Sequence, residues 1–200
     1  MGNSALRSLA VLEDRSLSEY GGSVIAVDAH HWLYKYIAGI TRYRDQSNYT
    51  TEDGTEVANL VALYRGLPTL LNNGIEPIFV FDGKPHELKQ DTIDSRRESK
   101  EQAKQKMEAA IQEGDTEAVR RYKAQTTRLT ETIHKTSREF LEAAGIPYVE
   151  AGGSGEAYAA QMVKEGYADC VMTDDYDALL FGSPVTIRQA SGKGPAEAML

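Results

Sequence analysis

The chain has 200 residues, of which 41% are hydrophobic and 26% are charged, a composition typical of one soluble globular domain. No apolar run approaches about 18 residues, and no basic region with an apolar core opens the chain, so we expect neither a membrane span nor a secretory signal. A single cysteine, Cys170, excludes an intrachain disulfide and a cysteine-rich zinc site. We therefore expect an intracellular protein.

The charge of the chain is unevenly distributed. A net charge of −8, taken alone, argues against a polyanionic partner. However, 13 of the 22 lysines and arginines lie between Lys84 and Arg138. The stretch from Lys84 to Glu142 is therefore rich in bases and nearly neutral, while the rest of the chain is acidic.

The first part of the chain contains two predicted strands separated by two predicted helices. Ser23–Asp28 is an apolar, β-branched run that ends in an acid, and Pro77–Asp82 repeats this design. Between them, His31–Ile40 and Val57–Asn73 have apolar residues at helical spacing, and Gln46–Glu56 is predicted as a loop. Continuous apolar runs of this kind are typical of parallel strands that are buried on both faces.

Two long, charged helices are predicted next. They span Leu88–Glu113 and Thr116–Ala144, with a break between them at Gly114 and Asp115. Asp115 can cap the start of the second helix, and Gly145 can end it.

The last part of the chain contains three short predicted strands and one predicted helix. Ile146–Val149, Cys170–Thr173 and Val185–Arg188 are strand candidates, and Glu156–Glu165 is a predicted helix that ends at Gly166. Strands that alternate with helices predict an α/β fold with a mainly parallel central sheet flanked by helices.

Acidic residues recur where the predicted strands end. They are Asp28, Asp82, Glu156, Asp175 and Asp177. Ligands of parallel α/β sheets bind beyond the carboxyl ends of the strands, so we expect these carboxylates to share one rim. No histidine accompanies them in a ligand pattern, and ligation by oxygen alone suits Mg²⁺ or Mn²⁺. Each acid alone fits an ordinary turn or cap, so the prediction of a metal site that hydrolyses phosphate esters depends on the whole set.

A series of motifs, in order along the whole chain, resembles the flap endonuclease family of structure-specific 5′ nucleases, most of all its archaeal members. The motifs are MGN at the start, VIAVDA, GIEPIFVFDGKPHELK, the pair Arg96 and Arg97, GIPYVEA, GEAYAA and TDDYDALLFGSP. The resemblance implies a PIN-like 5′-nuclease fold in one domain, residues 1–200, with a helical arch at about residues 84–140. It also implies hydrolysis of phosphodiester bonds in branched DNA with a 5′ flap, during replication and repair, by a 5′ flap endonuclease and 5′–3′ exonuclease.

The resemblance implies roles for individual residues in metal binding and catalysis. It implies two Mg²⁺ ions, for which Mn²⁺ can substitute, held at Asp28, Asp82, Glu156, Asp175 and Asp177. Lys89 and Arg96 match basic residues at the base of the arch that reach the scissile phosphate, where a cation would offset developing charge. Without the resemblance, both would be interpreted as part of a solvated helix face.

Three further residues match DNA-contacting positions of the family. Tyr34 matches an aromatic on which a nucleobase can stack, although helical spacing makes a core tyrosine an equal interpretation. Arg65 matches an arginine near the duplex, and Gly2 matches a small residue that lets the chain start lie close to the active site.

The chain departs from the family pattern in two ways. The family places two glutamates two residues apart where this chain has Ser154 and Glu156. Ser154 supplies no carboxylate, which should weaken metal binding, and it is instead expected to cap the helix Gly155–Glu165. The chain also ends at Leu200, before the family's duplex-binding part and the tail that binds the sliding clamp, so we expect a fragment or a truncated relative.

Three functions remain open on the sequence alone. The first is a metal-dependent flap endonuclease of the nucleoid, with branched DNA as its partner and no membrane association. The second is a non-catalytic relative that binds flap DNA, which Ser154 and the early end would explain. The third is a PIN-type ribonuclease, which shares acids at strand ends but usually lacks long arch helices.

Overall fold

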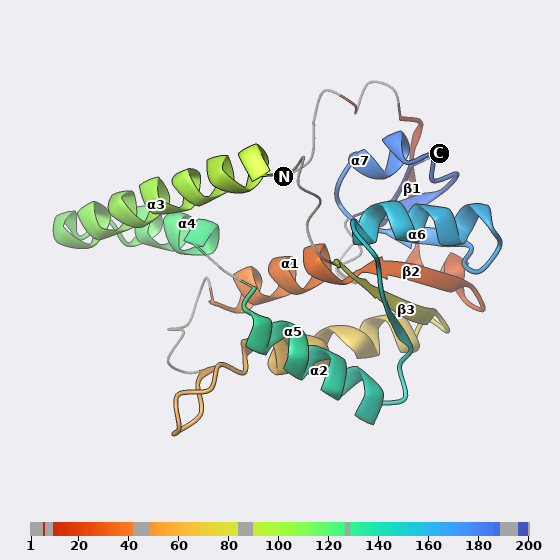
Figure 1. The fold of residues 1–200 in the computed structure, drawn as a ribbon, viewed down its shortest axis with the longest axis horizontal. Helices are drawn as coiled ribbons and strands as arrows, with labels where there is room; N and C mark the ends of the chain where they lie inside the picture. Colours follow the sequence, from red (N-terminus) through yellow and green to blue (C-terminus); the bar gives the residue numbers. More distant parts are fainter. Residues whose placement is uncertain are drawn as a thin grey trace. The chain divides into compact units, whose positions relative to one another are not determined.

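The structure is a computed structural model that describes Leu6 and residues 10–41, 49–83, 90–126, 129–188 and 196–199. The chain divides into two compact units, drawn together in Figure 1. Unit 1 comprises Met1–Trp32, Tyr64–Lys84 and Arg138–Leu200, and unit 2 comprises Leu33–Leu63 and Pro85–Ser137. The predicted acids at strand ends all belong to unit 1.

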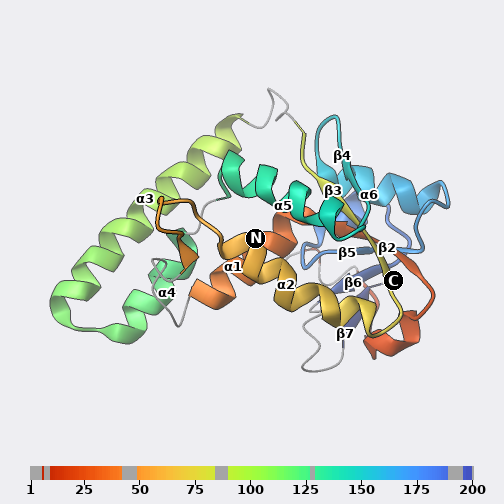
Figure 2. The same ribbon diagram turned by 90° about the horizontal axis from the view of Figure 1, so that it is seen from below.

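Unit 1 is built on a sheet whose strands follow the order β1-β7-β6-β5-β2-β3-β4. Five adjacent strands of this sheet run parallel, which confirms the predicted α/β fold with a mainly parallel sheet. They are β6 (Thr186–Arg188), β5 (Cys170–Met172), β2 (Val24–Asp28), β3 (Glu76–Phe81) and β4 (Tyr148–Glu150). The sheet is seen from below in Figure 2.

Two strands at one edge of the sheet were not predicted. β1 (Leu12–Arg15) pairs antiparallel with β7 (Ala196–Met199), and β7 pairs antiparallel with β6. The sequence LEDR of β1 is short and lacks an apolar run, so its strand conformation depends on the partner strand. A short 3₁₀ helix, Leu17–Tyr20, follows β1 and is capped by Ser16.

The side chains of alternate residues of β3 lie on opposite faces of the sheet, as expected for a strand. Val80 packs in an apolar cluster with residues of α6 (Gly155–Lys164), which lies over one face (Figure 1). Phe79 and Phe81 lie on the other face, where the ring of Phe79 meets Trp32 edge-on and the guanidinium of Arg138 lies 5.7 Å from the centre of the Phe81 ring. Both faces of the strand are therefore covered, which explains its continuous apolar sequence.

The remaining helices are α1 (Ala29–Thr41), α2 (Ala58–Leu71), α3 (Gln90–Glu113), α4 (Thr116–Thr126), α5 (Glu131–Ala143) and α7 (Asp177–Leu180). Within unit 2, α3 and α4 pack against each other side by side (Figure 2). Asp115 caps α4 as predicted, because its Oδ1 accepts the N–H of Ala118 at 2.9 Å. The role of these helices as an arch stays a prediction.

The prediction of one continuous helix over Thr116–Ala144 was wrong, because the structure contains α4 and α5 as separate helices. The hydroxyl of Thr130 accepts the N–H of Ile133 at 3.2 Å and so caps the start of α5. In the predicted loop, Thr50 and Glu56 form an isolated bridge, and residues 46–48 lie outside the described part. Across the described ranges, no helix has both the length and the apolar character needed to cross a membrane.

Candidate metal centre

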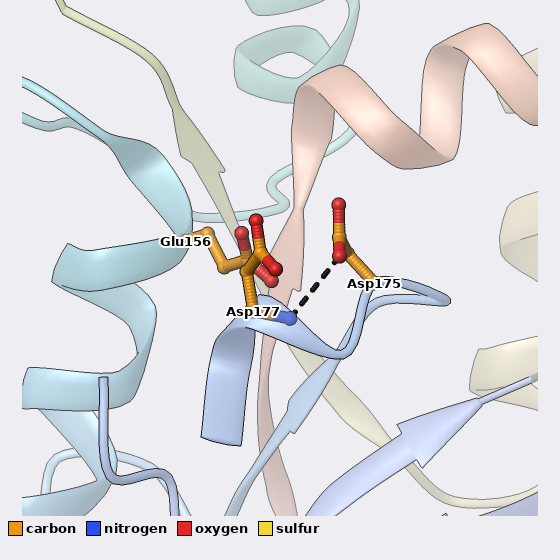
Figure 3. Close-up of side chains that lie close together, drawn as sticks. All are labelled: Glu156, Asp175 and Asp177. Atoms are coloured by element: carbon orange, nitrogen blue, oxygen red, sulfur yellow. Dashed lines mark hydrogen bonds between the residues drawn. The ribbon is translucent and has the colours of Figure 1, made fainter. Parts of the chain in front are cut away.

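Three carboxylates of unit 1 form a compact group, shown in Figure 3. Glu156 in the first turn of α6, Asp175 after β5 and Asp177 at the start of α7 each place one oxygen within 4.8 Å of the others. Carboxylates this close repel one another, and a cation between them would remove the repulsion. The sequence predicted this convergence from the positions of the acids at strand ends.

The turn after β5 fixes the two aspartates of this group through backbone hydrogen bonds. The N–H of Asp175 donates to the hydroxyl of Thr173 at 3.2 Å. The N–H of Asp177 donates to Oδ1 of Asp175 at 3.1 Å, the dashed line in Figure 3. The turn thus holds both side chains at the carboxyl end of the sheet.

Asp28, at the end of β2, is buried and linked to the same turn. Its Oδ1 accepts the N–H of His31 at 3.0 Å, and its Oδ2 accepts the hydroxyl of Thr173 at 3.3 Å. Thr173 therefore donates to Asp28 and accepts from Asp175, so two of the predicted ligands share one hydroxyl.

Asp82 follows β3 and is held by the start of α6. Its Oδ1 accepts the N–H of Gly155 at 2.6 Å. Residue 83 must be glycine, because a Cβ there would lie 1.9 Å from the carbonyl oxygen of Ala151. Asp28 and Asp82 stand outside the group of three, but repulsion from the Asp82 carboxylate contributes to the raised pKa of Asp28.

The electrostatics of the site favour a cation. Burial, followed by repulsion from Asp175, Asp28 and Asp177, raises the pKa of Glu156 to about 8. Burial is also the main cause that raises the pKa of Asp28 to about 6. Among the described residues, the buried Oε1 of Glu156 has no hydrogen-bond partner. A divalent metal would satisfy this oxygen and offset the repulsion, so the side chains present fit such an ion.

Two histidines lie next to this site, and sequence reasoning missed both. Nδ1 of His30 lies 3.7 Å from Oδ2 of Asp82, and Nε2 of His31 lies 3.5 Å from Oδ2 of Asp174. The pair follows Asp28, the end of β2, after the single residue Ala29, which was the available signal. The extra acid Asp174 is not part of the group of three in Figure 3.

Ser154 takes the expected position but not the expected contact. It is the N-cap residue of α6, yet its side chain makes no capping hydrogen bond. The predicted capping role of this hydroxyl was therefore wrong.

The remaining predicted site residues are the proposed DNA-contacting and catalytic side chains. Tyr34 lies half-buried on α1 in unit 2, where burial raises the pKa of its phenol. Arg65 is exposed on the part of α2 that belongs to unit 1. Arg96 falls within α3, while its side chain, Gly2 and Lys89 lie outside the described part. Their roles stay predictions.

Comparison with known proteins identifies two family regions. Residues 3–103 match the XPG N-terminal domain, and residues 145–199 match the XPG I-region. The chain is 46% identical over 199 residues to flap endonuclease 1 of Haloarcula marismortui and 48% identical over 200 residues to that of Halobacterium salinarum. Each alignment covers 100% of this chain and 61% of the relative, so the chain spans about three fifths of these curated proteins.

Solved structures agree with this assignment. Flap endonuclease-1 from Methanococcus jannaschii matches with a TM-score of 0.71 and 34% identity, over 98% of this chain and 62% of that one. The catalytic core of Rad2 in complex with DNA substrate matches with a TM-score of 0.67 at 24% identity, over 100% of this chain and 54% of that one, and supports the fold alone. The chain therefore belongs to the flap endonuclease family, of the archaeal type, and spans its XPG N-terminal domain and I-region.

Proposed function

We propose that this chain is the nuclease region of a metal-dependent 5′ flap endonuclease that hydrolyses phosphodiester bonds of branched DNA. The observation that carries the proposal is the group of Glu156, Asp175 and Asp177, with the buried, unpartnered Oε1 of Glu156 among the described residues. All three residues lie within the matched XPG I-region, which supports the proposed nuclease function.

The metals in this proposal are two Mg²⁺ ions, for which Mn²⁺ can substitute, because the clustered donors are all oxygens. The residues that would hold them are Asp28, Asp82, Glu156, Asp175 and Asp177. When bound, such ions supply Lewis acidity, which acidifies water and offsets the charge that develops on a phosphate during hydrolysis. The protein would contribute the fixed positions of the carboxylates, through the hydroxyl of Thr173 and the N–H of Gly155.

Basic and aromatic residues would bind the DNA. Lys89 and Arg96 would contact the scissile phosphate, Tyr34 would stack on a nucleobase, and Arg65 would contact the duplex. All four lie within the matched XPG N-terminal domain, which supports these roles. Gly2 would keep the start of the chain close to the active site.

The substrate in this proposal is DNA with a 5′ flap, threaded under an arch at about residues 84–140 of one nuclease domain. The printed name of the relatives, flap endonuclease 1, supports this choice. A sliding clamp is the expected further partner of the longer relatives.

The test is single-turnover cleavage of a labelled 5′-flap DNA with Mg²⁺ and then Mn²⁺, with the protein at concentrations that saturate binding. We expect cleavage at the base of the flap, lost in Asp82→Asn and enhanced in Ser154→Glu. Undiminished cleavage by Asp82→Asn would show that the metal assignment is wrong. The same assay should include a single-stranded RNA of matched length. We expect this RNA to be cut more slowly than the 5′-flap DNA, because faster cleavage of the RNA would indicate a ribonuclease.

A second candidate, a non-catalytic protein that binds flap DNA, is favoured by Ser154 in place of the family glutamate. It predicts flap binding in EDTA and no turnover after Mg²⁺ is added back. Any measurable single-turnover cleavage by the unmodified chain excludes it. Cleavage by Ser154→Glu alone would locate the defect at this position.

A further inference from the structure

The turn between β5 and α7 carries two of the three clustered carboxylates, so its conformation determines the geometry of the site. Asp175 and Asp177 flank Tyr176, whose side chain is buried. Two N–H groups of the turn donate to the side chains of Thr173 and Asp175, and the hydroxyl of Thr173 links the turn to Asp28 of β2. A second link between the turn and the sheet comes from β6.

Arg188, the last residue of β6, makes this contact on both sides of Asp175. Its Nε and Nη2 donate to the carbonyl oxygen of Asp174 at 3.1 and 3.0 Å. Its Nη1 donates to the hydroxyl of Tyr176 at 2.6 Å, and its guanidinium carbon lies 3.9 Å from the centre of the Tyr176 ring. One side chain thus holds the residues immediately before and after Asp175.

Asp174 is held at its other end as well. Its carboxylate lies 3.5 Å from Nε2 of His31, while its carbonyl oxygen accepts from Arg188. Asp174 therefore contacts α1 through its carboxylate and β6 through its carbonyl oxygen, and the carboxylate lies outside the group of three.

We propose that Arg188 is a positioning residue of the metal centre, which holds Asp175 in place by fixing the Asp174 carbonyl and the Tyr176 ring. The inference rests on the proposed function, because it takes the carboxylate group as a divalent-metal site. Partners that orient metal ligands without touching the metal are typically worth about 10–100-fold in metal affinity. Loss of Arg188 should therefore weaken metal binding even though it supplies no ligand.

The contacts require an arginine. The planar fork of a guanidinium donates two hydrogen bonds to one acceptor and stacks on a ring at the same time, whereas an ammonium group is a point charge. Arg188→Lys should therefore keep the charge and one donor but lose the stacking and the second bond. We expect its metal affinity to lie between that of the unmodified chain and that of Arg188→Met.

The test is a calorimetric titration of the whole chain, free of DNA, with Mn²⁺ at fixed pH. We expect the Kd to rise about 10–100-fold in Arg188→Met and to rise less in Arg188→Lys. The matched control is Arg138→Met. Arg138 also lies over a ring, that of Phe81, and its Nε lies 3.3 Å from Oε1 of Glu150, which is outside the carboxylate group.

The outcomes separate this inference from the proposed function. An unmodified chain that binds Mn²⁺ and an Arg188→Met variant with the same Kd would overturn the inference and leave the proposed function standing. If the unmodified chain itself binds no Mn²⁺, the metal site fails and both are overturned. A fall in affinity in Arg138→Met equal to that in Arg188→Met would show a general structural effect and would also overturn the inference.

If Arg188→Met does not fold, Arg188→Lys and Tyr176→Phe decide the question. Tyr176→Phe removes only the hydroxyl that accepts from Nη1 of Arg188. Weaker Mn²⁺ binding in both variants, with melting temperatures close to that of the unmodified chain, supports the positioning role. Unchanged affinity in both overturns it.

Discussion

The backbone N–H of Gly155 donates a 2.6 Å hydrogen bond to Oδ1 of Asp82. This bond joins the end of β3 to the first turn of α6, where Glu156 is the next residue. A Cβ at position 155 would lie 3.2 Å from Oδ1 of Asp82 and from the carbonyl oxygen of Val80, a contact tighter than ordinary packing, so glycine eases the close approach. The positions of two predicted metal ligands are thereby coupled.

Gly83, the residue after Asp82, provides a test of how closely this loop approaches the loop before α6. In Gly83→Ala the new Cβ would lie 1.9 Å from the carbonyl oxygen of Ala151, so the two loops must separate. We expect the free energy of unfolding to fall by about 3 kcal/mol or slightly more, the upper range for overpacking. In a protein of this size, thermal denaturation should show this as a Tm lower by about 6–12 °C.

The control for this substitution is Gly152→Ala in the facing loop. A Cβ at position 152 has no atom within 4 Å among the described residues, so its Tm should stay within a few degrees of the unmodified chain. Equal Tm values for Gly83→Ala and Gly152→Ala would show that the loops do not meet as described.

The raised pKa of Glu156 predicts how stability depends on pH without metal. Since burial and repulsion raise its pKa from 4.5 to about 8, the folded protein holds this proton more tightly than the unfolded chain. The free energy of unfolding in EDTA should therefore fall as the pH rises from about 4.5 to about 8. Asp28, with its pKa raised to about 6, contributes only to the lower part of this window.

Glu156→Gln isolates this effect, because the amide mimics the protonated acid and does not titrate. Denaturant unfolding in EDTA should show that the variant lacks the loss of stability between about pH 6.5 and pH 8. Mg²⁺ should stabilise the unmodified chain more at the upper end of this range, because it binds the ionised carboxylates. An identical pH slope in both proteins would contradict the assignment to Glu156.

The central strands β2, β3 and β5 were predictable because each is an apolar run whose residues are mostly buried. The predicted Ser23–Asp28 and the observed Val24–Asp28 differ by one residue, and Cys170–Thr173 differs equally little from Cys170–Met172. β1 was not predictable from its own residues, because Leu12 finds its partner Met199 at the other end of the chain. Pairing over such a separation leaves no local signal.

The site was predictable as a set of acids but not as a geometry. Strand-end positions predicted that five carboxylates share one rim, because parallel strands place their carboxyl ends there. The structure groups three of them, Glu156, Asp175 and Asp177, while Asp28 and Asp82 stand outside the group. The carboxylate of Asp174 instead lies against His31, and its carbonyl oxygen accepts from Arg188. These partners come from α1 and β6, so the orientation of Asp174 depends on tertiary contacts that no local pattern contains.

A buried amide in unit 2 predicts a large effect on stability. Asn59 of α2 is fully buried, and its Nδ2 donates to the carbonyl oxygen of Ile133 and to the hydroxyls of Thr136 and Ser137 of α5, at 2.8–3.1 Å. Asn59→Ala would leave the carbonyl and the buried Ser137 hydroxyl without this donor. We expect a loss of about 2–3 kcal/mol in the free energy of unfolding, measured with denaturant.

The exposed Asn72, just past the end of α2, gives the matched control. Asn72→Ala removes the same atoms from an exposed position, so its effect should stay within about 0.5 kcal/mol. Similar losses in Asn59→Ala and Asn72→Ala would mean that the amide of Asn59 does not join α2 to α5.

The thiol of the single cysteine should be unreactive toward thiol reagents while the protein is folded. Cys170 lies in β5 with 2% of its surface exposed, and burial, with a smaller contribution from the Asp169 carboxylate, raises its pKa from 9.0 to about 12. A rise of about three units lowers the thiolate fraction near pH 8 by about 1000-fold, and the thiolate is the reactive form. Reaction with a disulfide reagent, followed by absorbance, should therefore be slow in buffer and complete within seconds in concentrated guanidinium chloride. Strand β5 is paired with β2 on one side and with β6 on the other. Rapid labelling in buffer would therefore mean that β5 separates locally from a neighbouring strand without global unfolding.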